Sequence, residues 1–392
     1  MKITKAEIFY LELRDLPAMH PVILRLDTDE GITGVGEVSM AGGIGQSGAA
    51  GMLKNMAESF AIGADPFKTE KLWENMFRNS LWTLGGGGST VFGAMSAIDN
   101  ACWDIRGKAL NLPVYQLLGG KTNENLRVYA SHVQGGWGPI PKVCVKPEEF
   151  AAEAEKAVSE GFSAVKINPV GVDAQGKRSA GLTKILSRNQ VRLFYDRVKA
   201  VREAIGPDVD LIIDTLCMLS DSTAIQLGRL WEELNIYYFE EAVHYLNVEM
   251  QVNVAKRLKI PMAAGEHLYT RWRYRPYFDQ GALAVIQPDI GNCGGFTEAK
   301  KICDYANVYD VTVQCHVYGS PIATAVALQM EAAIPNFLIH EHTPLLMRPS
   351  IMEICKNNYQ PAQGRFMVPS LPGIGIELND TFMKTQPCVV VK

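Results

Sequence analysis

Apolar residues in the second half of the chain occur in short runs, and each run ends in a polar residue. Leu211–Ile213 precedes Asp214, and Ile236–Phe239 precedes Glu240. The stretches between such runs carry apolar residues at helical spacing, as in residues 190–205. Alternating strand and helix units are typical of a parallel sheet with helices outside it. The pattern therefore predicts an α/β fold in which the strands close into a (β/α) barrel.

The barrel pattern begins near Leu126. We predict a first strand at Val128–His132, a helix at Pro147–Ser159 and a second strand at Phe162–Asn168. A polar, glycine-containing insertion at Val170–Gln190 then lengthens the interval before the next strand. Insertions that follow barrel strands lie over the face on which active sites are built, so we expect this one to approach a ligand.

The N-terminal third of the chain has a different pattern. Ile3–Leu13 and Val22–Val38 alternate apolar and polar residues, and Thr90–Leu110 shows helical spacing. These features predict a separate domain with strands and helices that ends near Thr122. After about Pro349 the strand–helix rhythm stops, so we expect the C-terminal tail to pack elsewhere.

Composition and charge exclude several classes of partner. The net charge is −4 over 392 residues, which argues against nucleic acid. No apolar run reaches the roughly 18 residues that would cross a bilayer, so no membrane partner is expected. The eight cysteines show no CxxC spacing. A disulfide or zinc framework is therefore not expected. We expect a cytoplasmic location instead.

Three acidic residues, Asp214, Glu240 and Glu266, follow three predicted strands at equal intervals. Because the carboxyl ends of barrel strands converge on one face, we expect the three carboxylates to lie together. Hard divalent cations prefer such oxygen ligands, and Mg²⁺ keeps positions open for water and substrate. Each acid could instead cap the helix that follows it. The equal spacing favours a metal site.

Five other polar residues at strand ends are candidates for chemistry: Lys166, Asn168, Asp289, His316 and Glu341. Lys166 stands in an apolar run, where a lysine is costly unless it faces carboxylates or an anionic ligand. Asn168 is two residues further on, so its side chain is expected on the same side. Asp289 and His316 follow adjacent strands, and a carboxylate beside an imidazole is the usual arrangement of a general base.

Together these residues resemble the motifs of the enolase superfamily, in its mandelate racemase/muconate lactonizing enzyme branch. Ala94–Lys108 is similar to the capping-domain helix of that branch. The barrel motifs are matched in order by Lys166-x-Asn168, Asp214, Glu240-Glu241, Gly265-Glu266, Gln287-Pro288-Asp289 and Cys315-His316. The nearest likeness is to sugar-acid dehydratases such as galactonate dehydratase, through the Lys-x-Asn pair, Arg271-Trp272 and the late Glu341.

The resemblance implies an architecture and a cofactor. Residues 1–122 would form an α+β capping domain, joined by a C-terminal segment of about 360–392. Residues 123–359 would form a modified (β/α)7β barrel. The cofactor would be Mg²⁺, held by the three equally spaced acids. Relatives also imply a homo-oligomer.

The implied reaction is the dehydration of an aldonic or aldaric acid. His316, oriented by Asp289, would remove the proton next to the carboxylate, and Lys166 would stabilise the anion that forms. Loss of the β-hydroxyl would then give a 2-keto-3-deoxy acid. The substrate would be contacted by Asn168, by Glu341 and by capping loops near His20 and Gly43–Gln46.

Three departures from galactonate dehydratase leave the identity of the sugar acid open. Leu216 stands where that enzyme has a histidine, Glu240-Glu241-Ala242 replaces the usual Glu-Glu-Pro, and the Val170–Gln190 insertion is long. A racemase or epimerase, a cycloisomerase and a non-catalytic ligand-binding relative are the alternatives. Racemisation needs a base on both faces of the carbon, and Asn168 cannot accept a proton. A complete set of catalytic residue types argues against a binding protein.

Overall fold

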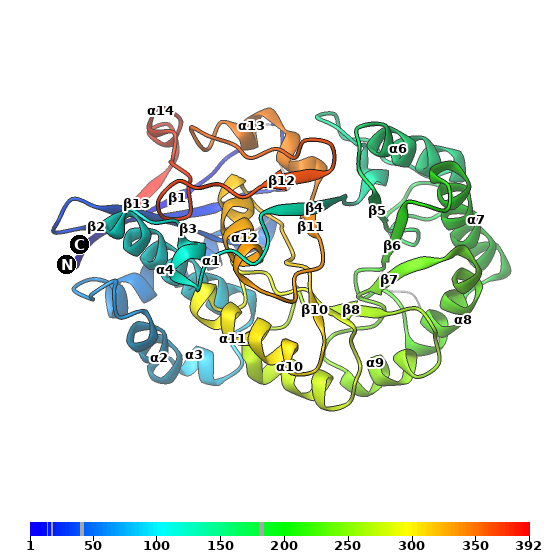
Figure 1. Cartoon of the computed structure of the whole chain (residues 1–392), viewed down its shortest axis with the longest axis horizontal. Coiled ribbons are helices and arrows are strands. Elements are labelled where there is room, and N and C mark those ends of the chain that lie inside the picture. The colour runs from blue at the N-terminus through cyan, green and yellow to red at the C-terminus, as the bar shows by residue number, and fades with distance from the viewer. Residues whose placement is uncertain (14, 17–18, 40–42, 180–183) are drawn as a thin grey trace.

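The computed structural model describes residues 1–392 except 14, 17–18, 40–42 and 180–183. Figure 1 shows two parts side by side, an antiparallel sheet with its helices and a ring of parallel strands surrounded by helices. The two chain ends lie together at the outer side of the antiparallel sheet (Figure 1).

The larger part is a parallel barrel. Its strand order is β10-β9-β8-β7-β6-β5-β4-β11 within the described residues. The strands are β4 (Asn125–Ala130), β5 (Ala164–Ile167), β6 (Asp210–Asp214), β7 (Ile236–Glu240), β8 (Met262–Ala264), β9 (Val285–Ile286), β10 (Thr312–Val313) and β11 (His340–His342). The ring is joined because Phe337, just before β11, pairs with Val313 of β10, and β11 pairs with β4. An apolar layer fills the interior, with residues such as Tyr129, Ile212 and Tyr238.

Helices connect the barrel strands on the outside. The main ones are α6 (Pro147–Ser159), α7 (Arg188–Ile205), α8 (Asp221–Trp231), α9 (Val248–Ala255), α10 (Thr270–Asp279), α11 (Gly295–Asn307) and α12 (Pro321–Ala333), with short turns η3 (Val133–Gly135), η4 (Glu232–Leu234) and η5 (Pro344–Met347). Serine caps define several of their starts, for example Ser187 Oγ, which accepts from the backbone N–H of Gln190. In the described part of the chain no helix is long and apolar enough to cross a membrane.

The smaller part contains an antiparallel sheet in the order β13-β1-β2-β3. Its strands are β1 (Ile3–Tyr10), β2 (Val22–Thr28), β3 (Thr33–Val38) and β13 (Cys388–Val391). Helical segments beside it are η1 (Gly43–Gly45), α1 (Gln46–Met56), η2 (Ala57–Ala61), α2 (Thr69–Asn79), α3 (Leu81–Leu84), α4 (Gly88–Leu110) and α5 (Val114–Leu117). The C-terminal region adds α13 (Pro349–Met352), β12 (Arg365–Met367) and α14 (Asp380–Met383).

Strand β3 lies directly against α4. A side chain on Gly36 would overlap the carbonyl oxygen of Ala97 in α4, and one on Gly34 would overlap that of Ala101. Glycine at both positions allows the strand and helix backbones to approach each other. The end of β3 thereby reaches the barrel, where Ser39 N donates to the carbonyl of Gly291 at 3.2 Å.

The predicted fold class, a modified (β/α)7β barrel with an α+β capping domain, is confirmed. The helix predicted at Pro147–Ser159 has the same bounds in α6. The strand predicted at Phe162–Asn168 is shorter, because β5 covers Ala164–Ile167. The C-terminal strand β13 pairs with β1 of the capping sheet. The domain boundaries at residues 122 and 359 remain predictions.

Candidate active site

The carboxyl ends of the barrel strands carry the predicted acids. β6 ends at Asp214 and β7 at Glu240, and these two residues are partners in the parallel register. Glu266 lies two residues beyond β8. The backbone next to these acids is strained, with φ of 45° at Leu216 and 44° at Glu241. Non-glycine residues seldom adopt this region, and such strain is concentrated at functional sites.

Lys166 projects from β5 into this group of acids and is completely buried. Its Nζ lies 2.7 Å from Glu240 Oε1, 2.9 Å from Glu341 Oε1 and 4.0 Å from Asp214 Oδ2. Burial by itself lowers the pKa of Lys166, but the three carboxylates outweigh burial and raise the pKa well above its usual value. The prediction that this lysine faces carboxylates is confirmed.

Glu341, on β11, is held by three donors. Besides Lys166, the hydroxyl of Ser131 donates to Oε1 at 2.7 Å and the backbone N–H of Val317 donates to Oε2 at 3.0 Å. Burial raises the pKa of Glu341, but Lys166 and His316 outweigh it and lower the pKa below its ordinary value. Glu341 is therefore an ionised carboxylate of fixed orientation.

His316 and Asp289 form a hydrogen-bonded pair, called here the His316–Asp289 dyad. The chain segments after β9 and β10 continue side by side, since His316 N donates to the carbonyl of Pro288 at 3.2 Å. His316 Nδ1 lies 2.8 Å from Asp289 Oδ2, and Nε2 lies 3.3 Å from Glu266 Oε2. Burial lowers the pKa of His316, but Glu266 and Asp289 outweigh burial and raise it to about 10. The imidazole is thus protonated at neutral pH in this arrangement.

The three predicted metal ligands do not form a coordination cluster as their side chains stand. Among the described residues, no group of three or more His, Cys, Asp and Glu side chains is arranged to hold a metal ion. Glu240 Oε2 is nevertheless buried without a hydrogen-bond partner among them. Burial raises the pKa of Glu240 well above normal, and the charges of Asp214 and Glu266 add to this effect. A buried carboxylate oxygen that lacks a donor suits a hard cation such as Mg²⁺. The donor set fits the ion, and the metal site remains a prediction.

Besides Ser131 and Val317, three further residues outside the predicted set contact it. His132, just after β4, places Nε2 3.1 Å from Asp214 Oδ2, and His267 places Nε2 3.1 Å from Glu266 Oε1. Ser39, from the capping domain, donates from Oγ to the dyad carboxylate at 2.6 Å. Both histidines follow barrel strands, as the predicted residues do. Their position after a strand is the sequence feature that could have identified them. Ser39 carried no signal, because its contact depends on how the two domains meet.

Asn168 and His20, two predicted substrate contacts, have other neighbours in the structure. Asn168 follows the end of β5, and its Oδ1 accepts from Val170 N at 3.0 Å, so it shapes the turn that leaves the strand. His20 lines a different cavity, together with Gln46. The capping loop expected at residues 43–46 is helical, because Gly43–Gly45 form η1 and Gln46 begins α1. Substrate binding by Asn168 and His20 remains a prediction.

His316, Glu266 and Glu341 line one cavity of about 630 Å³. Leu16 reaches its wall from the capping domain, and Arg178 reaches it from the insertion after β5. Arg178 thus brings the insertion to the cavity, and its contact with a ligand remains a prediction. The volume is typical of a small-molecule site.

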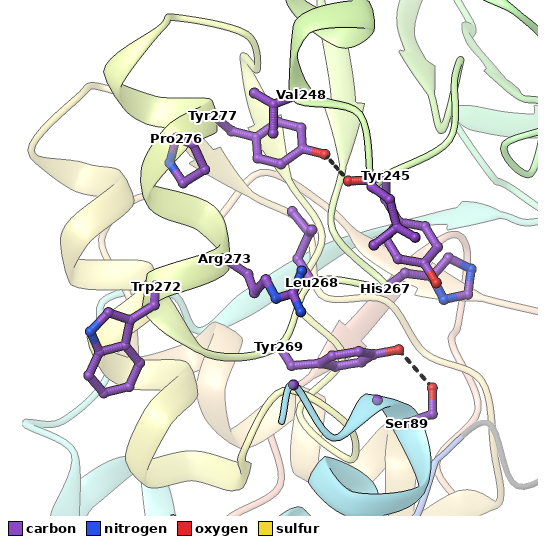
Figure 2. Close-up of a pocket in the computed structure, with 13 residues that line it drawn as sticks. Ser89, Tyr245, Val248, His267, Leu268, Tyr269, Trp272, Arg273, Pro276 and Tyr277 are labelled. Atoms are coloured by element: carbon purple, nitrogen blue, oxygen red, sulfur yellow. Dashed lines mark hydrogen bonds between the residues drawn. The ribbon is translucent and has the colours of Figure 1, made fainter. Parts of the chain in front are cut away.

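A second cavity, of about 400 Å³, adjoins His267 (Figure 2). Its walls come from α10, from the segments after β7 and β8, and from the starts of α4 and α9. Figure 2 shows the hydroxyls of Ser89 and Tyr269, 2.8 Å apart, joining the capping helix to the barrel. The dyad and the predicted metal ligands are not among its described lining residues, so this cavity is not the candidate catalytic site.

Comparison with protein families agrees with this architecture. Residues 149–382 match the family described as enolase C-terminal domain-like, and residues 16–119 match the mandelate racemase/muconate lactonizing enzyme N-terminal domain. The chain belongs to the enolase superfamily. Members of this superfamily that resemble it do so along the whole chain, capping domain and barrel together.

Among these relatives, the D-galactonate dehydratase of Variovorax paradoxus is 30% identical over 385 residues, which are 97% of this chain and 93% of the relative. A crystal structure of an enolase-superfamily member from Salmonella Typhimurium is 47% identical, with a TM-score of 0.96 and 100% of both chains covered. A candidate dehydratase from Zymomonas mobilis ZM4 is 46% identical, with a TM-score of 0.97 and coverage of 100% of this chain and 99% of that one.

Proposed function

We propose that the chain is a magnesium-dependent sugar-acid dehydratase, a hydro-lyase that converts an aldonic or aldaric acid into a 2-keto-3-deoxy acid. The observation that carries the proposal is the His316–Asp289 dyad, whose imidazole lines the same cavity as Glu266 and Glu341. The D-galactonate dehydratases that are 30% identical over nearly the whole chain support the reaction class. A homo-oligomer and a cytoplasmic location remain predictions.

His316 Nε2 is the atom that takes the proton next to the carboxylate, because Nδ1 is engaged by Asp289. Ser39 also donates to Asp289 and thereby fixes the carboxylate that orients the ring. The imidazole must be neutral to accept a proton. Since Glu266 raises the pKa of His316, proton removal requires that another cation take up the charge of Glu266. The imidazolium can then return its proton to the β-hydroxyl, which leaves as water.

The anion that forms needs positive charge beside it. A Mg²⁺ ion held by Asp214, Glu240 and Glu266 would stabilise the negative charge that develops on the substrate carboxylate. Lys166 supplies a further cation at a fixed place, because Glu240 and Glu341 hold its Nζ from two directions. Preorganised charges of this kind stabilise a transition state without having to reorganise during the reaction.

A screen of the purified protein with MgCl₂ against aldonic and aldaric acids tests the proposal, with 2-keto products trapped by semicarbazide. We expect product from one or a few acids, a loss of at least about 100-fold in His316→Asn, and no product in EDTA. His244→Asn is the matched control, because His244 is exposed and lies outside the lining of the cavity. A silent panel, or turnover that survives in His316→Asn, would contradict the proposal. Solvent deuterium exchange at C2 without dehydration would indicate a racemase instead.

A further inference from the structure

The segment after β11 places two buried polar side chains without partners on the wall of the cavity that His316 lines. Arg348 is 6% exposed and Thr343 is 8% exposed, and both line the cavity that contains His316. Within the described residues, Arg348 Nε, Arg348 Nη1 and Thr343 Oγ1 have no hydrogen-bond partner. The same wall therefore offers a guanidinium and a hydroxyl that the protein itself leaves unsatisfied.

An unpaired buried guanidinium is costly, because burial removes water from a charge that the protein does not replace. Burial lowers the pKa of Arg348, and the charge of Asp15 only partly opposes this. No described carboxylate lies within 4.0 Å of Arg348 as an ion-pair partner, whereas Lys166 in the same site has two within 3 Å. A buried cationic group without an ion-pair partner in the protein is suited to bind an anionic ligand.

The site thus has two cationic regions of different kinds. Lys166 is completely buried and lies behind Glu341 of the cavity wall, at the end of the ligand where the proposed reaction takes place. Arg348 stands apart from the acids around Lys166, and Arg178 adds a second, exposed cation to the lining. A substrate with one carboxylate satisfies only the first region. A substrate with a carboxylate at each end satisfies both.

We propose that Arg348, with the hydroxyl of Thr343, binds the second carboxylate of a dicarboxylic sugar acid, so that the substrate is an aldaric rather than an aldonic acid. The inference rests on the proposed dehydratase function for its reaction. The subsite itself rests on the two unpartnered side chains. A phosphate ester at the same end of the substrate would meet the same cation, and the experiment below separates the two.

Stereochemically matched pairs of substrates test the inference: galactarate with galactonate, glucarate with gluconate, and mannarate with mannonate. Members of a pair differ only at C6, in a carboxylate against a hydroxymethyl group. We expect kcat/KM to favour the hexarate of the reactive pair by roughly 10- to 100-fold, the size of a charge-assisted hydrogen bond. Arg348→Gln should abolish most of that preference. Preference for a hexonate, or for 6-phosphogluconate, would overturn the inference and leave the dehydratase in place.

Arg202→Gln is the matched control for this substitution. Arg202 is half-buried, but its guanidinium donates to the carbonyls of Gly206, Val209, Leu234 and Asn235, on the side of the barrel where strands begin. We expect Arg202→Gln to lower the unfolding temperature and to leave the hexarate-to-hexonate ratio as in the wild type. Arg348→Gln should not lower the unfolding temperature, because it removes unsatisfied donors. A destabilised Arg348→Gln protein would indicate a structural role instead.

A binding measurement makes the subsite testable without turnover. Adipate and hexanoate are six-carbon acids that differ in the second carboxylate, and neither has a hydroxyl to eliminate. We expect calorimetry to show tighter binding of adipate to the wild type, with the difference lost in Arg348→Gln. Adipate preference without turnover of any sugar acid would support the subsite and count against the dehydratase. Equal binding of the two acids would overturn the subsite.

Discussion

The buried ammonium of Lys166 is surrounded by the carboxylates of Asp214, Glu240 and Glu341. Its contribution to folding is therefore tied to the same acids that are proposed to bind metal and substrate. Breaking a buried ion pair by removing one partner leaves the other charge uncompensated, which is far more costly than losing a surface pair.

Replacing Lys166 with methionine tests this dependence. We expect Lys166→Met to lower the free energy of unfolding by about 3–5 kcal/mol, measured by urea titration. Lys300→Met is the control, because Lys300 pairs with Asp304 one helical turn away on the surface and should cost no more than about 0.5 kcal/mol. Equal stability of the two variants would show that the acids near Lys166 do not depend on its charge.

Glu37, near the end of β3, is a buried carboxyl group at the contact between the capping sheet and the barrel. It accepts hydrogen bonds from Ser320 N at 2.9 Å and from Ser320 Oγ at 2.7 Å. Burial outweighs these bonds and raises the pKa of Glu37 from 4.5 to about 7. Between these two pH values the folded protein keeps a proton that the unfolded chain has released, so stability falls as pH rises through this window.

The variant Glu37→Gln removes this titration. A shift of this size corresponds to about 3 kcal/mol, so the wild type should lose about that much stability, relative to Glu37→Gln, between pH 4.5 and 7.5. Outside the window the difference between the two proteins should be constant. Urea unfolding at a series of pH values measures it. Parallel stability curves across the window would mean that Glu37 is already ionised when folded.

At the scale of elements, α4 acts as the cap of a barrel helix. The N-cap of α11, Gly294, has no side chain, so its first turn is satisfied from the other domain. Asp99 accepts from Thr297 N at 2.9 Å and Thr297 Oγ1 at 2.6 Å, and Asn100 Oδ1 accepts from Phe296 N at 3.0 Å. A helix N-terminus favours such acceptors and negative charge. The hydrogen bonds that satisfy the first turn of α11 therefore also join the capping domain to the barrel.

Asp99→Ala should therefore destabilise both sides of this contact. We expect a loss of about 1–3 kcal/mol in unfolding free energy, since buried donors of Thr297 are left without an acceptor. Asp99→Asn keeps one acceptor oxygen and should lose less. Hydrogen exchange of the α11 amides locates the effect. If Asp99→Ala loosened only α4, the capping role would be refuted.

At the scale of the whole molecule, the C-terminal tail completes the N-terminal sheet. β13 pairs with β1 from Ala6 to Phe9, and Val391 is buried in the core of the capping domain. Without β13, β1 would become an edge strand with unpaired backbone groups, which is a template for aggregation.

Deleting residues 388–392 tests this arrangement. We expect the β1 amides to lose protection from hydrogen exchange and the protein to associate on heating, while the barrel amides stay protected. Size-exclusion chromatography after a heat step records the association. Protection of β1 equal to that of the full chain would show that β13 adds nothing to the sheet.

Local signals explain which elements were predictable. Pro147 begins α6, and helical spacing continues to Ser159, so local residues were enough to predict both ends of the helix. The His316–Asp289 dyad followed from the rule that adjacent parallel strands end side by side. The strand predicted to reach Asn168 ends at Ile167, and Asn168 Oδ1 accepts from Val170 N in the loop that follows. Substrate contact by Asn168 remains a prediction.

Contacts between distant segments were beyond sequence reasoning. Ser39 reaches Asp289 across 250 positions of chain, and nothing near Ser39 announces that contact. Arg348 lies in the region where the repeating strand–helix pattern stops. That its Nε and Nη1 lack hydrogen-bond partners is known only from the structure of the cavity wall. The side-chain positions of the predicted metal ligands could not be predicted either. In the structure Lys166, His132 and His316 contact these acids, and such contacts depend on residues that are far apart in the sequence.

The pairing of β13 with β1 also bears on the order in which a ribosome delivers the chain. β1 emerges before every barrel strand, and its partner β13 emerges after all of them. Until β13 is synthesised, the backbone groups of β1 that pair with it have no partner strand, although the barrel can already form. Ribosome-bound chains that stop before residue 388 should therefore be cleaved by protease near β1 and resist it in the barrel. A chain released early, however complete its barrel, leaves translation with its capping sheet unclosed.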